Sequence, residues 1–520
     1  MGSAGNCQFV TVTAEVLQPT RRLVERVRTV PTLPVVLGLL AIGRLLEFRQ
    51  GGSPDEGGFL VVANQWHAGG TSLYGNYWVD RPPLLLVIYR IADLLGGLGA
   101  LRVIGMVAAV ATAALVADTA RVAFGRRAAN WSVVVAAALL LSPLYGAVDV
   151  NGELLAAPFI ALGIRAAVEV FHTDEQLRSR LAALFTGAAA VAALLIKQNM
   201  ADVVIFAAIC WIVAWRTHRL KGRDLVDSIL FAGAGFVAGY AVVMLWALAH
   251  GSSPGDIYQA TYPFRITAAH VIAQGSAHAS GIRLEKLVDA FTWSFVPLLL
   301  VAFALFGIRR SRQPAIVAAL AVVLVFDAAS VFAGGSYWLH YLIQSAPAVA
   351  LAAGATSLAA PRVIRAATAL VAASAIIATG SVVAHPTATP GTTVGDAVRS
   401  VAQPGDTLVL AFGDADILRN SGLTSPYPYL WSIPSRGLDP DLTLLRGLLA
   451  GPSAPTWIVV HGDSFKQRLH TTGTAALIIQ RYKLVSRICG RSIYLLDTVH
   501  RAVPTQDRTC TGGTLLPNLP

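Results

Sequence analysis

The chain has 520 residues, of which 55% are hydrophobic and only 13% are charged, about half the charged fraction of an ordinary soluble domain, so a soluble globular fold is excluded. The formal net charge is +11, but Lys and Arg gather in short loops between apolar runs, as on the cytoplasmic side of membrane proteins. Basic residues are not interleaved with aromatic ones, which argues against nucleic-acid binding. The composition predicts a polytopic α-helical membrane protein.

The amino-terminal segment, residues 1–29, has no cleavable signal pattern and ends in a cluster of arginines, Arg21, Arg22, Arg26 and Arg28. Because positive residues beside a span stay in the cytoplasm, we expect this segment to be cytoplasmic. The first apolar run, 30–46, is then an uncleaved anchor. The polar segment 47–83 follows it as a first outer loop, long enough to carry function.

The next apolar piece, 84–95, decides the sidedness of the rest. If it does not cross fully and 101–120 runs inward, the basic residues after 120 lie inside; a full crossing would place them outside. We prefer the first alternative, because the later basic loops then all fall on the cytoplasmic side. The further spans are predicted over residues 130–144, 154–170, 181–196, 203–215, 228–249, 291–308, 315–332, 341–358 and 366–383. This gives about eleven transmembrane helices within residues 30–385.

Residues 386–520 change to short helical and β-rich segments, including strands expected near 407–412 and 457–460 and a hairpin over 484–496. This pattern predicts a small α/β domain, extracytoplasmic if the eleven spans are correct, which stabilises the protein or positions an acceptor. Cys489 and Cys510 share this domain, and a disulfide and two free thiols are both open. None of the four cysteines has metal-ligand spacing.

Acidic residues stand just beyond the first span, at Asp55 and Glu56. A carboxylate at a membrane face can take the proton of an acceptor hydroxyl, because partial desolvation brings its pKa toward the working pH. Both residues could equally be hydrated parts of the loop. Glu153 opens a later span on the same side, where it could serve the site or simply favour the helix start.

Basic residues also stand at outer helix ends. Arg81 precedes two prolines that fix the local backbone, and its planar fork suits a phosphate, although an interfacial Arg often reaches lipid headgroups instead. Lys197 could hold an anion or be an ordinary interfacial lysine. His340 could donate to a phosphate, steer a carboxylate or be structural, while its neighbours Tyr337 and Trp338 are typical of an aromatic belt.

Taken in order, these pieces resemble the glycosyltransferase C (GT-C) superfamily, especially bacterial relatives of protein O-mannosyltransferases and lipid A aminoarabinose transferases. The likeness lies in their arrangement over about residues 30–385, and more loosely in the tail. The matching pieces are Asp55-Glu56-Gly57, Leu73-Tyr74, Arg81-Pro82-Pro83-Leu84, Ser142-Pro143 followed by Glu153, and His340-Tyr341. Each piece alone is weak, whereas the combination is specific.

Carried over by position, the resemblance implies that Asp55 is the catalytic base and that Glu56 assists it or binds the acceptor. Arg81 would hold the donor phosphate; it replaces a lysine common in the family, which keeps the charge but changes the phosphate geometry. We expect Lys197 and His340 to complete the phosphate site. We expect the acceptor or second acidic site to comprise Glu153, Tyr74 and Tyr341.

The implied reaction moves a sugar from a polyprenyl-phosphate donor to an acceptor hydroxyl on a lipid, glycan or protein outside the cytoplasm, with inversion. No cofactor is required, although a divalent cation could bridge phosphate and carboxylate. Mannose- and arabinose-type donors both fit, as do cell-envelope acceptors. The alternative is a transporter or lipid flippase, which would favour repeated halves or charged helices near mid-membrane. Here the candidate charges lie at outer helix ends.

Overall fold

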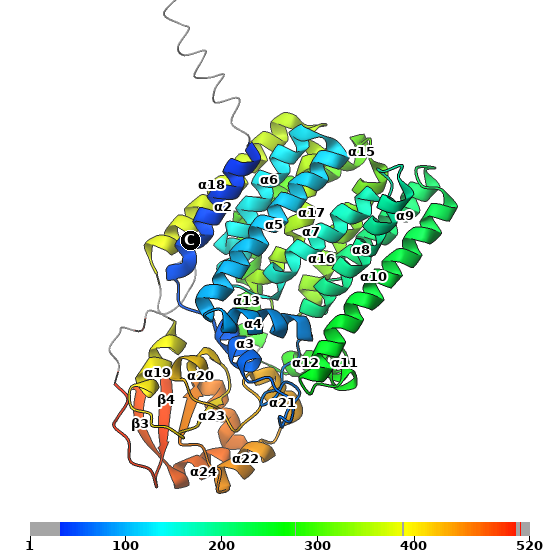
Figure 1. The fold of residues 1–520 in the computed structure, drawn as a ribbon. Helices are drawn as coiled ribbons and strands as arrows, with labels where there is room; N and C mark the ends of the chain where they lie inside the picture. The colour runs from blue at the N-terminus through cyan, green and yellow to red at the C-terminus, as the bar shows by residue number, and fades with distance from the viewer. Residues whose placement is uncertain (1–31, 276, 387–388, 506–509, 511–520) are drawn as a thin grey trace, which may run out of the picture.

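A helical bundle carries a smaller α/β unit at one end of the molecule (Figure 1). The computed structural model describes residues 32–275, 277–386, 389–505 and 510. The expected cytoplasmic segment 1–29 therefore lies outside the described residues. The bundle is built from α2 Thr32–Leu46, α5 Leu98–Phe124, α6 Arg126–Leu141, α7 Gly152–Glu169, α8 Gln176–Ile196, α9 Asp202–Arg216, α10 Gly222–Ala249, α16 Pro314–Ala333, α17 Ala346–Ser357 and α18 Pro361–Ala384.

Small residues let these helices approach closely. A Cβ placed on Gly187 of α8 would lie 1.8 Å from the carbonyl oxygen of Ala232 on α10, and one on Gly235 of α10 would lie 2.0 Å from that of Leu184. Such backbone contact is typical of helix packing within membranes, where dispersion forces and hydrogen bonds hold helices together. The glycines therefore fix the distance between α8 and α10.

Five described helices are long and apolar enough to cross a membrane: α5, α8, α10, α16 and α18. A sixth span is possible by length from a bent pair, His278–Trp293 and Val296–Arg310, whose axes differ by 64°. This pair comprises α13 Ala277–Trp293, α14 Val296–Ala302, a π-helical turn η3 Phe303–Gly307 and α15 Ile308–Arg310. The chain is thus a multi-pass membrane protein, while the predicted count of about eleven stays a prediction.

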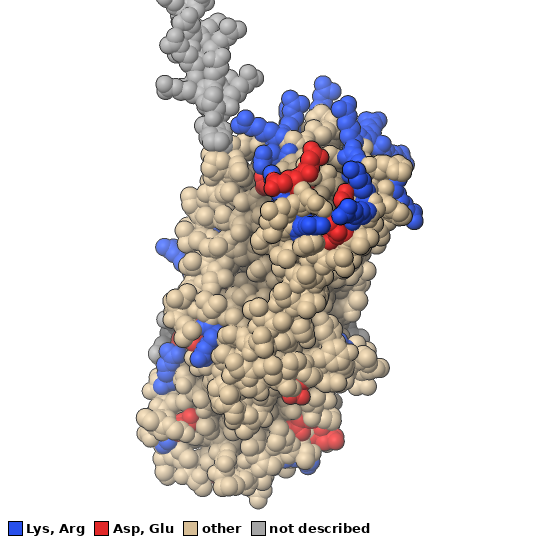
Figure 2. All heavy atoms as spheres, turned by 45° about the vertical axis from the view of Figure 1, so that its right-hand side comes forward, with Lys and Arg blue, Asp and Glu red and all other residues tan. Residues whose placement is uncertain are grey.

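Lys and Arg side chains gather at the bundle end opposite the α/β unit (Figure 2). Ion pairs join neighbouring helices there: Arg180 of α8 lies 2.7 Å from Asp227 of α10, and Arg165 of α7 lies 2.5 Å from Asp118 of α5. A positive end is the cytoplasmic end by the positive-inside bias. The charge distribution therefore supports, as a prediction, a cytoplasmic face here and an outer face at the α/β unit.

Short elements cover the other bundle end: η1 Glu47–Arg49, α3 Pro54–Asn64, α4 Pro83–Leu94, η2 Pro143–Tyr145, α11 Pro254–Thr261, α12 Phe264–Ala273 and η4 Leu339–Ser345. Helix α4 lies across the bundle direction (Figure 1). Its 12 residues cover about 18 Å at a rise of about 1.5 Å per residue, well short of the roughly 30 Å of a bilayer core. This length favours the alternative in which 84–95 does not cross.

The α/β unit contains a four-stranded sheet in the order β1-β2-β4-β3. Strands β1 Leu408–Ala411 and β2 Trp457–His461 are parallel, with Leu408 opposite Trp457, whereas β4 Arg491–Leu496 is antiparallel to both β2 and β3 Tyr482–Ile488. The strands lie where the sequence pattern predicts them. The helices of the unit are α19 Pro390–Arg399, α20 Asp416–Ser421, α21 Ser432–Leu438, α22 Thr443–Ala450, α23 Gly462–Thr471 and α24 Thr474–Arg481.

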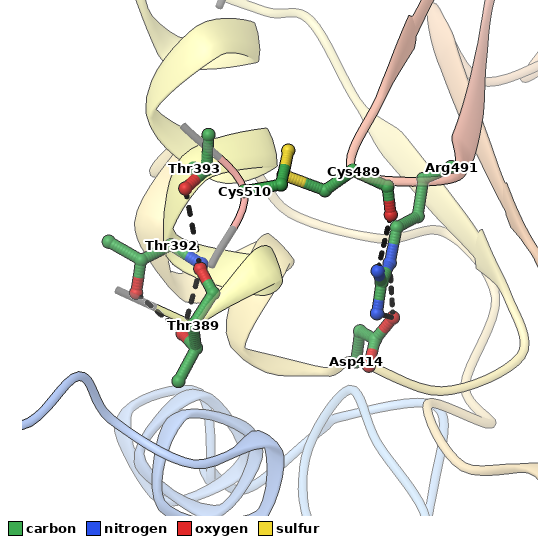
Figure 3. The surroundings of a disulfide bond; sticks show 7 residues. All are labelled: Thr389, Thr392, Thr393, Asp414, Cys489, Arg491 and Cys510. Atoms are coloured by element: carbon green, nitrogen blue, oxygen red, sulfur yellow. Dashed lines mark hydrogen bonds and ion pairs between the residues drawn. A yellow bond between two sulfur atoms is a disulfide. The ribbon is translucent and has the colours of Figure 1, made fainter. Parts of the chain in front are cut away.

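A disulfide joins Cys489, in the turn between β3 and β4, to Cys510 (Figure 3). Of the two alternatives left open by the sequence, the structure therefore forms the bond, with 5.3 Å between the Cα atoms. Next to it, Arg491 pairs with Asp414 at 2.9 Å. Because disulfides persist in oxidising compartments, this bond favours the predicted extracytoplasmic location of the unit.

Candidate functional site

Helix α3, inside the predicted first outer loop, carries both candidate acids in its first turn. It starts where Ser53 and Glu56 form a capping box: the Ser53 hydroxyl accepts from the Glu56 amide at 3.2 Å, and the Ser53 amide donates to Glu56 Oε2 at 2.9 Å. Pro54 occupies the first helical position, which its fixed backbone angle suits. The sequence Ser-Pro-Asp-Glu therefore sets where α3 begins and how its acids are placed.

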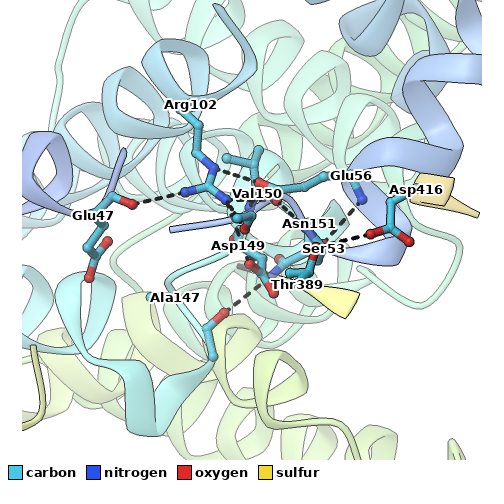
Figure 4. Close-up of polar contacts among 12 residues, drawn as sticks. Glu47, Ser53, Glu56, Arg102, Ala147, Asp149, Val150, Asn151, Thr389 and Asp416 are labelled. Atoms are coloured by element: carbon cyan, nitrogen blue, oxygen red, sulfur yellow. Dashed lines mark hydrogen bonds and ion pairs between the residues drawn. The ribbon is translucent and has the colours of Figure 1, made fainter. Parts of the chain in front are cut away.

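Glu56 is fully buried and paired with Arg102 of α5 (Figure 4). Arg102 Nε donates to Oε1 and Nη2 to Oε2, both at 2.9 Å, and the Val150 amide donates to Oε1 at 2.9 Å. Together with the Ser53 amide, which donates to Oε2, these groups bring donors from three segments to the two carboxylate oxygens. Glu56 joins α3 to the bundle, and its side chain has no exposed surface.

Arg102 holds further parts of this layer together. It donates to the Glu47 carbonyl at 3.1 Å and the Gly51 carbonyl at 3.2 Å, and lies 4.0 Å from Asp149. Burial, followed by the nearby charge of Glu56, raises the pKa of Asp149 from 3.8 to about 7, although Arg102 opposes this. Arg102 therefore connects three segments: the carbonyls at 47–51, the carboxylate of Glu56 and the carboxylate of Asp149.

Asp55 is partly exposed, unlike its neighbour Glu56. Its Oδ1 accepts a hydrogen bond from Nε1 of Trp431 in the α/β unit at 2.9 Å. Burial lowers the pKa of Arg81, but Asp80, Asp55 and other nearby acids more than offset this, so that the pKa is raised. The Asp55 carboxylate therefore lies close enough to interact electrostatically with Arg81, the residue predicted to bind the donor phosphate.

Arg81 is held at the start of α4 by acids and by its own backbone. Its Nη1 lies 2.7 Å from Oδ1 of Asp80, whose other oxygen pairs with Arg265 of α12 at 2.6 Å. The hydroxyl of the buried Tyr74 donates to the Arg81 carbonyl at 2.6 Å. Burial raises the pKa of Asp80, but Arg81 and Arg265 outweigh it and hold that pKa below its usual value. Two guanidinium groups thus share one carboxylate.

The remaining candidates meet beside Arg81. Lys197, after α8, pairs with the buried Glu153 of α7 and lies 4.4 Å from the centre of the Tyr341 ring. His340 Nε2 lies 3.8 Å from Glu153 Oε1, and its ring meets Tyr341 edge-on at 5.1 Å. Glu153 and Tyr341 also act electrostatically on Arg81. Three segments that are distant in sequence therefore place Arg81, Lys197 and His340 near the carboxylate of Glu153.

The structure brings together six of the eight predicted site residues: Asp55, Arg81, Glu153, Lys197, His340 and Tyr341. Glu56 lies behind this group in the Arg102 pair, and Tyr74 lies behind Arg81. Sequence reasoning missed Arg102, Asp80, Arg265 and Trp431. Arg102 could have been noticed as a charge at the edge of the apolar run 101–120, whereas Trp431 lies 376 positions from its partner and carries no local signal.

Within the described part of the chain, no group of three or more His, Cys, Asp or Glu side chains could hold a metal ion. Carboxylates near Arg81 and Lys197 instead have basic partners. The arrangement is therefore suited to binding an anion at the cations and to moving a proton at Asp55.

No family model matches this chain, and no curated protein matches it in sequence. Solved structures do. The structure of ArnT from Cupriavidus metallidurans bound to undecaprenyl phosphate matches with a TM-score of 0.60 at 14% identity, covering 89% of this chain and 97% of ArnT. The chain has the GT-C fold.

A second GT-C structure agrees. The Archaeoglobus fulgidus oligosaccharyltransferase in complex with Zn and sulfate matches with a TM-score of 0.52 at 13% identity, covering 85% of this chain and 69% of that one. At these identities the likeness concerns the fold. It confirms the predicted resemblance to the GT-C superfamily, and activity and substrates have to be argued from the site.

Proposed function

We propose that this protein is a membrane glycosyltransferase that moves a sugar from a polyprenyl-phosphate donor to an acceptor hydroxyl at the extracytoplasmic face. The observation that carries the proposal is the meeting of Asp55 with Arg81, Lys197 and His340 at one end of a GT-C fold. A base and a phosphate site side by side are what sugar transfer from a lipid phosphate needs. The oxidised Cys489–Cys510 pair supports placing this end outside the cytoplasm.

Arg81 and Lys197 are proposed to bind the donor phosphate. Both cations are held in place by carboxylates, Asp80 and Glu153, so they are ordered before the donor arrives. Preorganised cations stabilise the charge that grows on a leaving phosphate without reorganising during the reaction. His340 is proposed to donate to the same phosphate. The ArnT structure that shares this fold was solved with undecaprenyl phosphate, which supports a polyprenyl phosphate as the class of ligand.

Asp55 is proposed as the base that takes the proton of the acceptor hydroxyl. The acceptor oxygen then bonds to the anomeric carbon while the bond from that carbon to the phosphate oxygen breaks, and polyprenyl phosphate leaves onto Arg81 and Lys197. Attack from the side opposite the phosphate inverts the anomeric centre. Glu153, Tyr74 and Tyr341 were expected at the acceptor; Tyr74 is buried behind Arg81, so its proposed role is to hold the Arg81 backbone.

Glu56 is proposed to position Asp55 rather than to touch the acceptor, because its buried carboxylate is already bound by Arg102 and two backbone amides. It fixes the first turn of α3, on which Asp55 is the preceding residue. From the sequence, Asp55 was expected to be the base, and Glu56 was expected to assist it or to bind the acceptor. The proposal therefore divides them into one reacting group and one supporting group.

The experiment uses purified protein in lipid nanodiscs with a panel of radiolabelled polyprenyl-phosphate sugars, mannose- and arabinose-type donors included, and delipidated membrane extract as acceptor. Transfer that persists in excess EDTA is expected, since the cations named above are side chains. Lipid, glycan and protein products are separated to identify the acceptor. Donor movement across sealed vesicles without any transfer would favour a flippase and refute the proposal.

A further inference from the structure

We infer that Trp431 is a positioning residue of this transferase, through which the α/β unit orients the reacting carboxylate of Asp55. The inference rests on the proposed function, because it gives a role to a contact with the proposed base. It assigns the α/β unit a part in the site itself, beyond stabilising the protein.

The contact joins two distant parts of the chain. Trp431 Nε1 donates to Asp55 Oδ1 at 2.9 Å across 376 positions of sequence, and the indole ring lies 5.1 Å from the ring of Phe59, one turn further along α3. The ring contact fixes the indole, and the indole N–H then fixes one carboxylate oxygen. An indole N–H is only a donor, so Asp55 Oδ1 accepts from it and is held in that position.

The surface of α3 is shaped for this contact. A Cβ on Gly58 would lie 2.4 Å from Cζ2 of Trp431 and 2.7 Å from the Cβ of Ala415, and a Cβ on Gly57 would lie 2.6 Å from the Cα of Asp416. Two consecutive glycines therefore permit the α/β unit to dock directly behind Asp55. A side chain at Gly58 would push the indole away from the carboxylate, and one at Gly57 would clash with Asp416 of the α/β unit.

The geometry leaves the second oxygen of Asp55 for the acceptor. Glu56 and Ser53 fix the first turn of α3 from the bundle side, and Trp431 fixes the Asp55 side chain from the other side. The fixed helix turn sets the position of the Asp55 backbone, and the indole N–H then orients its carboxylate through Oδ1. Misplacement of a reacting group by about 1 Å can reduce a rate on the order of a hundredfold.

The test compares Trp431→Phe, which keeps the ring and removes the N–H, with wild type in the transfer assay. We expect kcat to fall about tenfold to a hundredfold, the cost of a hydrogen bond to a charged group, with little change in the KM for donor. Trp215→Phe, on the far end of α9, is the matched control and should behave as wild type.

An activity-independent readout keeps the two proposals apart. The carboxylate stretching band of Asp55, assigned by its absence in Asp55→Asn, is followed by infrared difference spectroscopy and should shift in Trp431→Phe but not in Trp215→Phe. An active wild type with unchanged kcat and an unchanged band in Trp431→Phe overturns the inference alone. An inactive wild type with the band shift refutes the transferase and with it the positioning role, while leaving the contact established.

Discussion

Replacing Arg102 by methionine should destabilise the protein severely while leaving the predicted phosphate site untouched. In the wild type the guanidinium makes two bonds of 2.9 Å to Glu56, and the two side chains are 3% and 0% exposed. The variant would leave a buried carboxylate with only the amides of Ser53 and Val150 as donors. Breaking a buried ion pair by removing one partner costs about 3–5 kcal/mol.

The free energy of unfolding would be measured in mixed micelles by titration with denaturing detergent, followed by circular dichroism. Arg121→Met is the matched control, because Arg121 lies on the same helix but pairs with Asp118 at 61% and 37% exposure, so its loss should cost no more than about 1 kcal/mol. The double variant Glu56→Gln with Arg102→Met should recover part of the loss, since no uncompensated charge remains. A cost of Arg102→Met as small as that of Arg121→Met would refute the reasoning.

Three further predictions concern other parts of the chain. Burial, and then the charge of Asp414, raises the pKa of Asp416 from 3.8 to about 7. Between about pH 4 and pH 7 the folded state therefore keeps a proton that the unfolded state releases, so stability should fall as the pH rises through this range. Asp416→Asn should reduce the difference between the melting temperatures at pH 5 and pH 8, and the same difference in variant and wild type would contradict the prediction. The disulfide spans 21 positions, which corresponds to about 3 kcal/mol of chain entropy, so dithiothreitol should lower the melting temperature of wild type but leave Cys510→Ser unaffected. Lys197→Met should raise the KM for donor at least about tenfold with partial rescue in Lys197→Arg; equal KM values in all three proteins would rule out a phosphate contact.

The hydrophobic pattern was sufficient to predict the membrane bundle and the strands of the α/β unit. The length of an apolar run and the periodicity of its apolar residues are properties of neighbouring residues, so both can be read from a short stretch of sequence. The preferred course of 84–95 could be argued from the basic loops alone, and the 12-residue α4 agrees with it. Local patterns could not define the total number of spans. Several bundle helices, such as the 12-residue α17, are shorter than a bilayer-crossing helix, and one candidate span is bent by 64°.

The candidate site was predictable where the residue type itself is unusual, as for carboxylates and arginines at outer helix ends. What the sequence could not give is which of two adjacent acids faces outward. Asp55 and Glu56 look alike in the chain, and only the capping box and Arg102 separate them. Trp431 could not be found at all, because its function depends on how the α/β unit docks onto α3.

The most direct test of the central claim compares Asp55→Asn with wild type in two measurements on the same folded protein: equilibrium binding of polyprenyl phosphate and single-turnover sugar transfer. Asn keeps the acceptor oxygen for the Trp431 indole but cannot take a proton. The account predicts unchanged lipid-phosphate binding and a transfer rate lower by about a hundredfold to ten-thousandfold, the range of general-base catalysis. A variant that binds and transfers at the wild-type rate would contradict the assignment of Asp55 as the base.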